Sequence, residues 1–144
     1  MVKVTVPATS ANVGAGFDAL GLAVSMHNTV TMEECGRIDI LASDGTLIPT
    51  GPGNLVYRSA KAVFDQLGQP LKGIRIRQEN PIPMARGLGS SSACIVAGIL
   101  GANALLGNLM GAANAAVIPQ KLVEGGMERS EAISQFGVVC GMTM

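Results

Sequence analysis

Residues 86–93, RGLGSSSA, place a basic residue, two glycines around a leucine, and three consecutive serines immediately before a strongly apolar stretch. Glycine lets a backbone approach a ligand closely, and serine hydroxyls add hydrogen-bond donors without bulk. A helix that begins at such a loop presents unpaired backbone N–H groups and the positive end of its dipole. The stretch therefore predicts a loop that binds an anion, and a phosphate suits it best.

An ordinary helix start is the competing interpretation of this stretch, with Ser90 as the N-cap and the glycines shaping the turn. Other glycine-rich motifs fit poorly. A Walker A loop needs a lysine, and none lies between Lys72 and Lys121. A nucleophile elbow needs glycine where Ala93 stands and also a histidine base, but the single histidine, His27, falls in a predicted strand. The phosphate loop and the plain helix start are the two interpretations that stay open.

Strand patterns come before the loop in the chain. Alternation of apolar and polar residues predicts strands at 2–6, which Pro7 ends, at 22–33 and at 37–43. Residues 8–21 are small, polar and rich in glycine, which predicts a loop. The first part of the chain is therefore expected to form a sheet.

Two helices and a further strand complete the predicted unit. Helical spacing of apolar residues covers 55–68, with Asn54 at the N-cap position and Gly68 at the end. Residues 72–80 read as a strand, and a second helix is expected to begin near Ser90. This order predicts an α+β fold in which a mixed sheet carries its helices on one side.

Composition excludes several classes of partner. The chain has 144 residues, which suits one domain, and ten basic residues balance ten acidic ones. Because these charges cancel, neither a nucleic acid nor an anionic membrane surface is expected as a partner. With one Tyr, three Phe and no Trp, the chain also has few side chains on which the bases of a single strand could stack. The cysteines are far apart, which indicates reduced thiols in a cytoplasmic protein rather than disulfides or a zinc site: Cys35, Cys94 and Cys140.

A long uncharged run raises a different possibility. Residues 87–120 contain no charged side chain, and 93–110 are numerous enough to cross a bilayer. Glycine and alanine outnumber leucine and isoleucine there, and three asparagines interrupt the run, which favours a buried helix packed closely on a sheet. Self-association into a homo-oligomer, or attachment to a membrane, is the alternative.

Three motifs together carry a resemblance to a known family. VPATSANVGAGFDALGLAV at 6–24 resembles the N-terminal motif of the homoserine kinases, and NLVYRSA at 54–60 resembles a segment that follows it. PIPMARGLGSSSA at 81–93 is similar to the phosphate loop of the GHMP kinase superfamily, to which that family belongs. The resemblance covers about residues 2–108. It implies the N-terminal half of a GHMP kinase, a fold like domain 2 of ribosomal protein S5.

The resemblance also implies an activity and a site. The activity is MgATP-dependent phosphorylation of the side-chain hydroxyl of L-homoserine, a step toward threonine. In the implied site Asn12 and Asp18 contact homoserine, Asn54 and Val56 lie near the adenine, and a loop surrounds the ATP phosphates. The loop residues so implied are Gly87, Leu88, Gly89, Ser90, Ser91 and Ser92, with Ser91 or Ser92 also approaching Mg²⁺.

The chain departs from the family after the apolar run. The family's E-x-H-x-D-N segment, whose glutamate helps to hold magnesium, does not occur, so no catalytic residue is carried over. The family's C-terminal domain is absent as well, and 109–144 are left as an unassigned tail with a short helix near 128–136. The chain therefore reads as a truncated homoserine kinase. The alternative is a fragment that binds nucleotide without turnover, because the glutamate that helps the family to hold magnesium does not occur.

Overall fold

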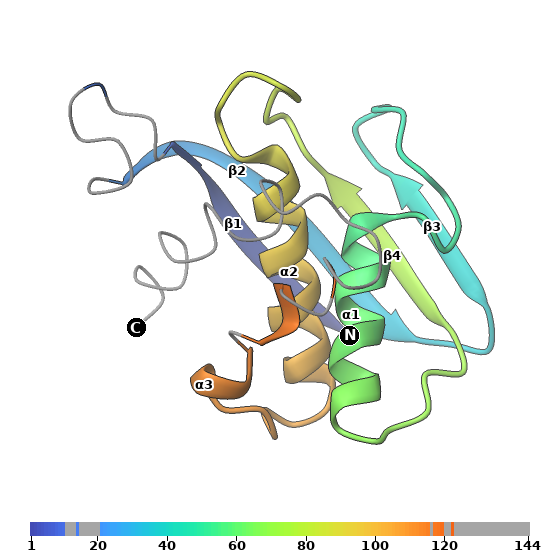
Figure 1. Cartoon of the computed structure of the whole chain (residues 1–144). Coiled ribbons are helices and arrows are strands. Elements are labelled where there is room, and N and C mark those ends of the chain that lie inside the picture. The colour runs from blue at the N-terminus through green and yellow to red at the C-terminus, as the bar shows by residue number, and fades with distance from the viewer. Residues whose placement is uncertain (11–13, 15–20, 116, 120–121, 123–144) are drawn as a thin grey trace.

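The computed structural model describes residues 1–10, 14, 21–115, 117–119 and 122 (Figure 1). Within them, strands and helices follow one another in the predicted order. The elements are β1 (Val2–Ser10), β2 (Leu22–Glu34), β3 (Ile38–Ala42), α1 (Leu55–Gln66), β4 (Ile74–Glu79), α2 (Ser90–Leu105) and the short α3 (Ala112–Ala115).

The strands form one mixed sheet in the order β1-β2-β4-β3. β2 pairs antiparallel with both β1 and β4, whereas β3 runs parallel to β4. Parallel neighbours need a crossover connection, and α1 supplies it between β3 and β4. Both long helices cover the same face of the sheet (Figure 1), so the predicted mixed sheet with its helices on one side is confirmed.

The core lies between this face and the two helices. Val30 and Met32 of β2 point into it beside Ile74 and Ile76 of β4, and all four are fully buried. Period-2 alternation sends the intervening residues to the other face. There Asp39 and its arginine partners form ion pairs across the strands. One face of the sheet is therefore apolar and packed, and the other is charged.

The first strand is longer than predicted. Alternation placed its end at Pro7, but β1 continues to Ser10, so residues 8–10 are strand rather than loop. Proline cannot donate to a ladder, yet it is tolerated at a sheet edge and next to a bulge. Both conditions hold, because β1 is an edge strand and its register with β2 shifts between Pro7 and Ala8. The pairing with β2 decides where the strand ends, and the local sequence does not show it.

The uncharged run forms the buried helix that its composition favoured. Most of α2 is buried, and its glycines allow close approach to neighbouring elements. A β-carbon on Gly101 would lie 2.7 Å from the side chain of Met32, so the helix sits directly on the sheet. Across the described residues, no helix combines the length and the apolar character that a bilayer crossing requires.

Two of the cysteines are described, and both are free thiols. Cys94 is buried in α2, and Cys35 is half-buried. Cys140 and the helix predicted near 128–136 lie outside the described residues.

Candidate functional site

The glycine-rich loop leads into α2 through left-handed backbone. Gly87 has φ of +71° and Gly89 has φ of +69°, a region that glycine occupies without strain. Gly89 is the N-cap of α2, and no side chain caps the helix. Ser90 is the first helical residue, so its predicted alternative role as the N-cap is wrong. The first-turn N–H groups of α2 therefore face the loop without help from a capping side chain.

Open space surrounds the middle of this loop. A β-carbon built on Gly87 would have no atom of another segment within 4 Å, so a side chain would fit there. Glycine is needed because the backbone is left-handed at this residue. The loop is tied to the sheet at Leu88, whose carbonyl oxygen accepts a hydrogen bond of 3.0 Å from the Thr9 N–H. An anchored loop with free space around Gly87 suits a ligand that lies against the backbone.

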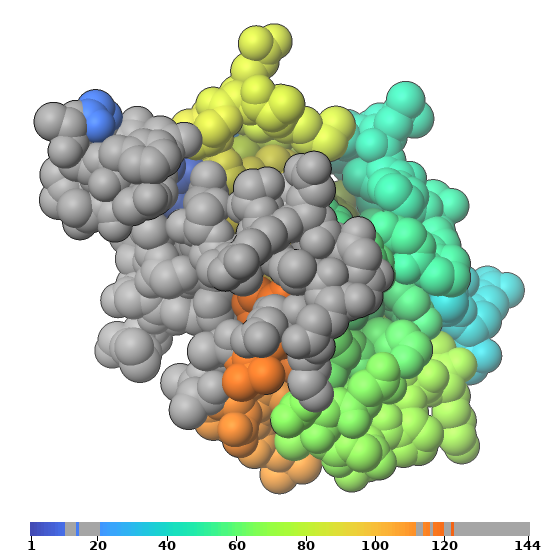
Figure 2. Space-filling model, viewed as in Figure 1, coloured from blue at the N-terminus to red at the C-terminus, as the bar shows by residue number. Residues whose placement is uncertain are grey.

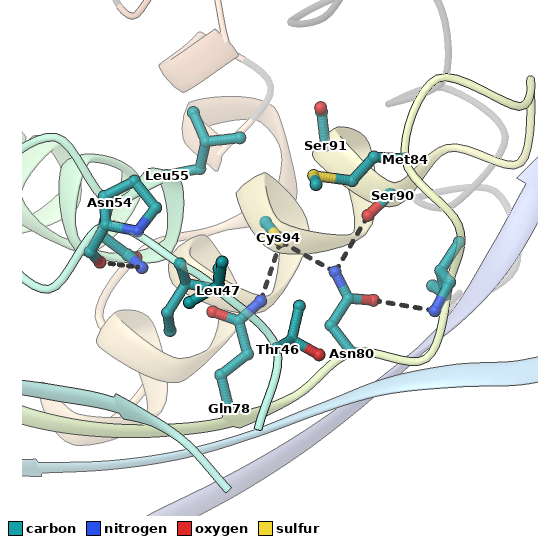
Figure 3. Close-up of a pocket in the computed structure, with 13 residues that line it drawn as sticks. Thr46, Leu47, Asn54, Leu55, Gln78, Asn80, Met84, Ser90, Ser91 and Cys94 are labelled. Atoms are coloured by element: carbon teal, nitrogen blue, oxygen red, sulfur yellow. Dashed lines mark hydrogen bonds between the residues drawn. The ribbon is translucent and has the colours of Figure 1, made fainter. Parts of the chain in front are cut away.

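A pocket of about 250 Å³ lies beside the loop (Figure 3). It opens between the segment that follows β3 and the segment that follows β4, which Figure 2 shows next to each other at one end of the molecule. Its polar lining consists of Thr46, Asn54, Gln78, Asn80, Ser90, Ser91 and Cys94. Its apolar lining consists of Leu47, Ile48, Pro49, Leu55, Ile82 and Met84.

None of the described residues that line the pocket has a charged side chain, so the pocket suits a neutral, largely apolar group. Leu47 and Met84 are large apolar side chains at this pocket and are 93% and 71% exposed. Such exposure costs free energy unless a ligand covers it. The two side chains come from different loops, and together they offer apolar surface to a planar ring.

Both long helices begin at this pocket. Asn54 and Leu55 at the start of α1 line it, and so do Ser90 and Ser91 at the start of α2. The helices run away from it side by side (Figure 1). Their positive dipole ends therefore point toward the same place, which favours an anion near the pocket.

Three amide side chains converge on the thiol of Cys94, and Figure 3 shows two of them, Gln78 and Asn80. Gln78 Nε2 lies 3.2 Å from Cys94 Sγ, Asn28 Nδ2 lies 3.5 Å from it and Asn80 Nδ2 lies 3.6 Å from it. Burial raises the pKa of the Cys94 thiol to about 11, against the lowering effect of the hydrogen bonds from Gln78 and Asn28. The thiol is therefore neutral near pH 7 and is a poor nucleophile.

Two carbonyl oxygens of this cluster have no hydrogen-bond partner among the residues that the structure describes. They are Asn28 Oδ1 and Gln78 Oε1, and both residues are almost fully buried. A buried acceptor without a donor costs free energy. Gln78 also lines the pocket, so a donor group on a ligand is one means of satisfying its oxygen.

The residues expected near a nucleotide base take different places. Asn54 lines the pocket, but its amide is engaged in the fold: Oδ1 accepts from the Tyr57 N–H at 3.1 Å and Nδ2 donates to the Pro49 carbonyl at 3.0 Å. Asn54 is thus the N-cap of α1, as predicted. Val56 is fully buried in the core and does not line the pocket.

Of the six loop residues, Ser90 and Ser91 line the pocket. Ser92 is buried in the first turn of α2. Asn12 and Asp18, the residues expected to contact an amino-acid substrate, lie outside the described residues. The part of the chain that is described holds no group of three or more His, Cys, Asp or Glu side chains that could bind a metal ion.

Sequence reasoning missed Gln78, Asn80 and Cys94 as pocket residues. One signal for Gln78 was available, because the alternation of β4 puts it on the same face as Ile74 and Ile76. A polar residue at a helix-facing position of a strand indicates a site or a buried network.

Known proteins that are similar to this chain belong to the family that the motifs predict. The sequence model of the family described as "GHMP kinases N terminal domain" matches residues 54–142, a range that includes most of the segment left unassigned above. The homoserine kinase of Petrotoga mobilis is 49% identical over 111 residues, which are 75% of this chain and 36% of that protein. The homoserine kinase of Moorella thermoacetica is 45% identical over 116 residues, which are 78% of this chain and 39% of that protein.

A solved structure, homoserine kinase from Cytophaga hutchinsonii, superposes with a TM-score of 0.71 at 30% identity. The alignment covers 93% of this chain and 45% of that one. The resemblance predicted from the motifs is thus confirmed. The chain spans only 36% to 39% of the length of the two curated relatives named above.

Proposed function

Because this chain belongs to the family of GHMP kinase N-terminal domains, we propose that it binds MgATP and takes part in phosphorylating the side-chain hydroxyl of L-homoserine in the cytoplasm. The observation that carries the proposal is the loop at 86–93. Two left-handed glycines lead there into a helix start that has no side-chain cap, beside a pocket whose described lining carries no charge. Relatives named homoserine kinase support the choice of substrate.

The two parts of the nucleotide fit the two parts of the site. The phosphates would lie against the loop, from Gly87 to Ser92, where backbone N–H groups and helix dipoles stabilise negative charge. The adenine would enter the uncharged pocket, between the exposed side chains of Leu47 and Met84. Asn54 would act there by holding the start of α1 and the carbonyl of Pro49, rather than through a spare polar group.

Magnesium fits this site only as a partner of the nucleotide. Hydroxyl oxygens are acceptable Mg²⁺ ligands, so Ser91 or Ser92 would complete a coordination sphere made mainly by phosphate oxygens and water. The loop at 86–93 contains no carboxylate, and none occurs among the described residues that line the pocket. When bound, the ion would neutralise charge on the phosphates during transfer.

Homoserine recognition would come from the N-terminal motif. The Asp18 carboxylate can pair with the amino group of an amino acid, and the Asn12 amide can orient its other polar groups. Phosphoryl transfer then depends mainly on alignment of the hydroxyl with the terminal phosphate and on charge neutralisation.

Calorimetric titration of the 144-residue chain with MgATP tests the nucleotide part of this proposal. We expect binding that Gly89→Val abolishes, because a side chain there strains the loop and crowds the phosphates. The matched control is Gly68→Val, since Gly68 has a similar φ of +64° but lies at the far end of α1. If the Gly89 variant folds and binds as tightly as the Gly68 variant, the phosphate site is wrongly located.

A nucleotide-binding domain without turnover is the second candidate. Within the described part of the chain, neither the loop nor the pocket lining offers a carboxylate, and this favours it, because transfer depends on charge neutralisation that a metal-binding carboxylate would support. Release of ADP that depends on homoserine and is lost in Asp18→Ala would favour the kinase. MgATP binding without such release would favour the second candidate.

A further inference from the structure

Asn80 links three segments around the pocket. Its Nδ2 donates a hydrogen bond of 2.9 Å to Ser90 Oγ, at the start of α2 (Figure 3). Its Oδ1 accepts a bond of 3.4 Å from the Ile82 N–H, and its own backbone N–H donates to Asp44 Oδ2 at 2.8 Å. Asn80 thus connects the turn after β3 and the exit of β4 with the first residue of the helix.

These bonds determine which way the Asn80 amide faces. An amide has one accepting atom and one donating atom, and the Ile82 N–H requires the acceptor on its side. The NH₂ group must therefore face Ser90. Since an NH₂ group only donates, Ser90 Oγ acts as the acceptor in this pair.

The consequence concerns the hydroxyl proton of Ser90. A serine hydroxyl has one proton and two accepting lone pairs. With one lone pair taken by Asn80, the proton points away from Asn80 and remains available as a donor. Ser90 is 7% exposed and lines the pocket at the end of the glycine-rich loop, so this donor lies where the proposed phosphates would be.

We propose that Asn80 is a positioning residue of the phosphate loop: by donating to Ser90 Oγ, it directs the Ser90 hydroxyl proton toward a phosphate oxygen of the bound nucleotide. This inference rests on the proposed function. Asn80 itself does not contact the phosphates. It acts through Ser90. Because the Asn80 amide already fixes the rotation of the Ser90 hydroxyl, nucleotide binding does not have to pay the entropy of fixing it.

Asp44 holds this arrangement from the other side. Its carboxylate accepts from the Thr46 N–H at 3.0 Å as well as from the Asn80 N–H. These bonds, that from Thr46 first, keep the pKa of the Asp44 carboxyl below its usual range, so the carboxylate is ionised at neutral pH. The Asp44 carboxylate therefore fixes the backbone of Asn80, and this helps to hold the Asn80 side chain in place against Ser90.

A double-mutant cycle tests the proposal on the full chain, with MgATP and adenosine as separate calorimetric probes. Asn80→Ser is the main variant, because a serine hydroxyl can still accept from the N–H two residues on but is too short to reach Ser90. Asn80→Ala is the second variant, and both are combined with Ser90→Ala.

We expect Asn80→Ser and Ser90→Ala each to weaken MgATP binding about tenfold, since each removes one oriented hydrogen bond to a charged group. The double variant should bind no more weakly than Ser90→Ala alone, because Asn80 acts only through that hydroxyl. Adenosine carries no phosphate, so its affinity should fall much less than the MgATP affinity in every variant, although Asn80 and Ser90 line the pocket.

Asn103→Ala is the matched control. Asn103 also makes two side-chain hydrogen bonds, to the backbone of Met110 at 2.8 and 3.0 Å, but it lies near the opposite end of α2. We expect it to lower stability without affecting either ligand. Losses that add in the double variant, or an adenosine affinity that falls as far as the MgATP affinity with Asn80→Ser, would overturn the positioning role alone. Absence of MgATP binding by the unmodified chain would overturn the proposed function and this inference together.

Discussion

Gly98 of α2 lies directly against Val56 of α1: a β-carbon built on the glycine would be 2.5 Å from the Val56 carbonyl oxygen and 2.7 Å from the Ser59 β-carbon. Real β-carbons do not approach other atoms so closely, so the two helices can be this near only because residue 98 has no side chain. Since both helices begin at the pocket, this contact sets the separation of the two starts, at Asn54 and Ser90.

Gly98→Ala is therefore expected to destabilise the chain by about 2 kcal/mol, despite the better helix propensity of alanine. The neighbours are largely backbone and cannot move independently. Gly101→Ala in the same helix is the matched control, because its β-carbon would meet the flexible end of Met32, which can shift. Urea unfolding checks the comparison. Equal losses in the two variants would contradict the close helix contact as the cause.

Asn54 should matter to stability as the cap of α1. Asn54→Ala removes the acceptor for the Tyr57 N–H and the donor to the Pro49 carbonyl, and should cost about 1–2 kcal/mol. Asn54→Asp keeps a capping oxygen and places a negative charge at the helix start, so its cost should be smaller. Thermal unfolding at neutral pH measures both. An aspartate variant as unstable as the alanine variant would mean that the bond to Pro49 dominates.

Gln78→Met should not lower stability. The change keeps the length of the side chain, removes a buried carbonyl oxygen that has no partner, and loses one amide contact to the Cys94 thiol. Removing an unsatisfied acceptor is worth about 1 kcal/mol or more, and the weak contact to sulfur offsets only part of this. The free energy of unfolding in urea should stay level or rise. A clear fall would show that the oxygen is satisfied after all.

Stability should depend on Asp39 at acid pH. Hydrogen bonds from Arg77 and then Arg75 lower the pKa of the Asp39 carboxyl from 3.8 to about 2. A group whose pKa is lower in the folded state stabilises the fold above its unfolded pKa, and this contribution is lost as pH falls toward its folded pKa. The free energy of unfolding should therefore decline between about pH 4 and pH 2.

Asp39→Asn is the variant that isolates this effect. It should show a shallower decline over the same pH range, with the Asp44 carboxyl still contributing because its pKa is also lowered. Chemical unfolding at a series of pH values measures the slope. If the variant keeps the slope of the unmodified chain, the acid sensitivity does not come from the pairing of this carboxylate with the two arginines.

Local signals in the sequence determined most of the elements. The Asn54 cap, the Gly68 stop and the apolar spacing between them predicted α1 closely, and period-2 alternation predicted β2, β3 and β4. The glycines before Ser90 likewise indicated the start of α2. These signals act over a few residues, through backbone conformation, capping hydrogen bonds and the alternation of side chains between two faces. They can therefore be recognised without knowing which distant segments pack nearby.

Tertiary structure alone decided how far β1 runs and what surrounds the loop. Pro7 lies within a strand because β1 is at the sheet edge and its pairing with β2 shifts there. Asn28 in β2 meets Cys94 together with Gln78 and Asn80, although Asn28 is 66 residues away from the cysteine in the sequence. The same packing lets the Asn54 amide donate to the Pro49 carbonyl and the Asn80 amide donate to Ser90 Oγ. Partners of buried polar groups depend on which distant segments pack together, and no local pattern encodes that.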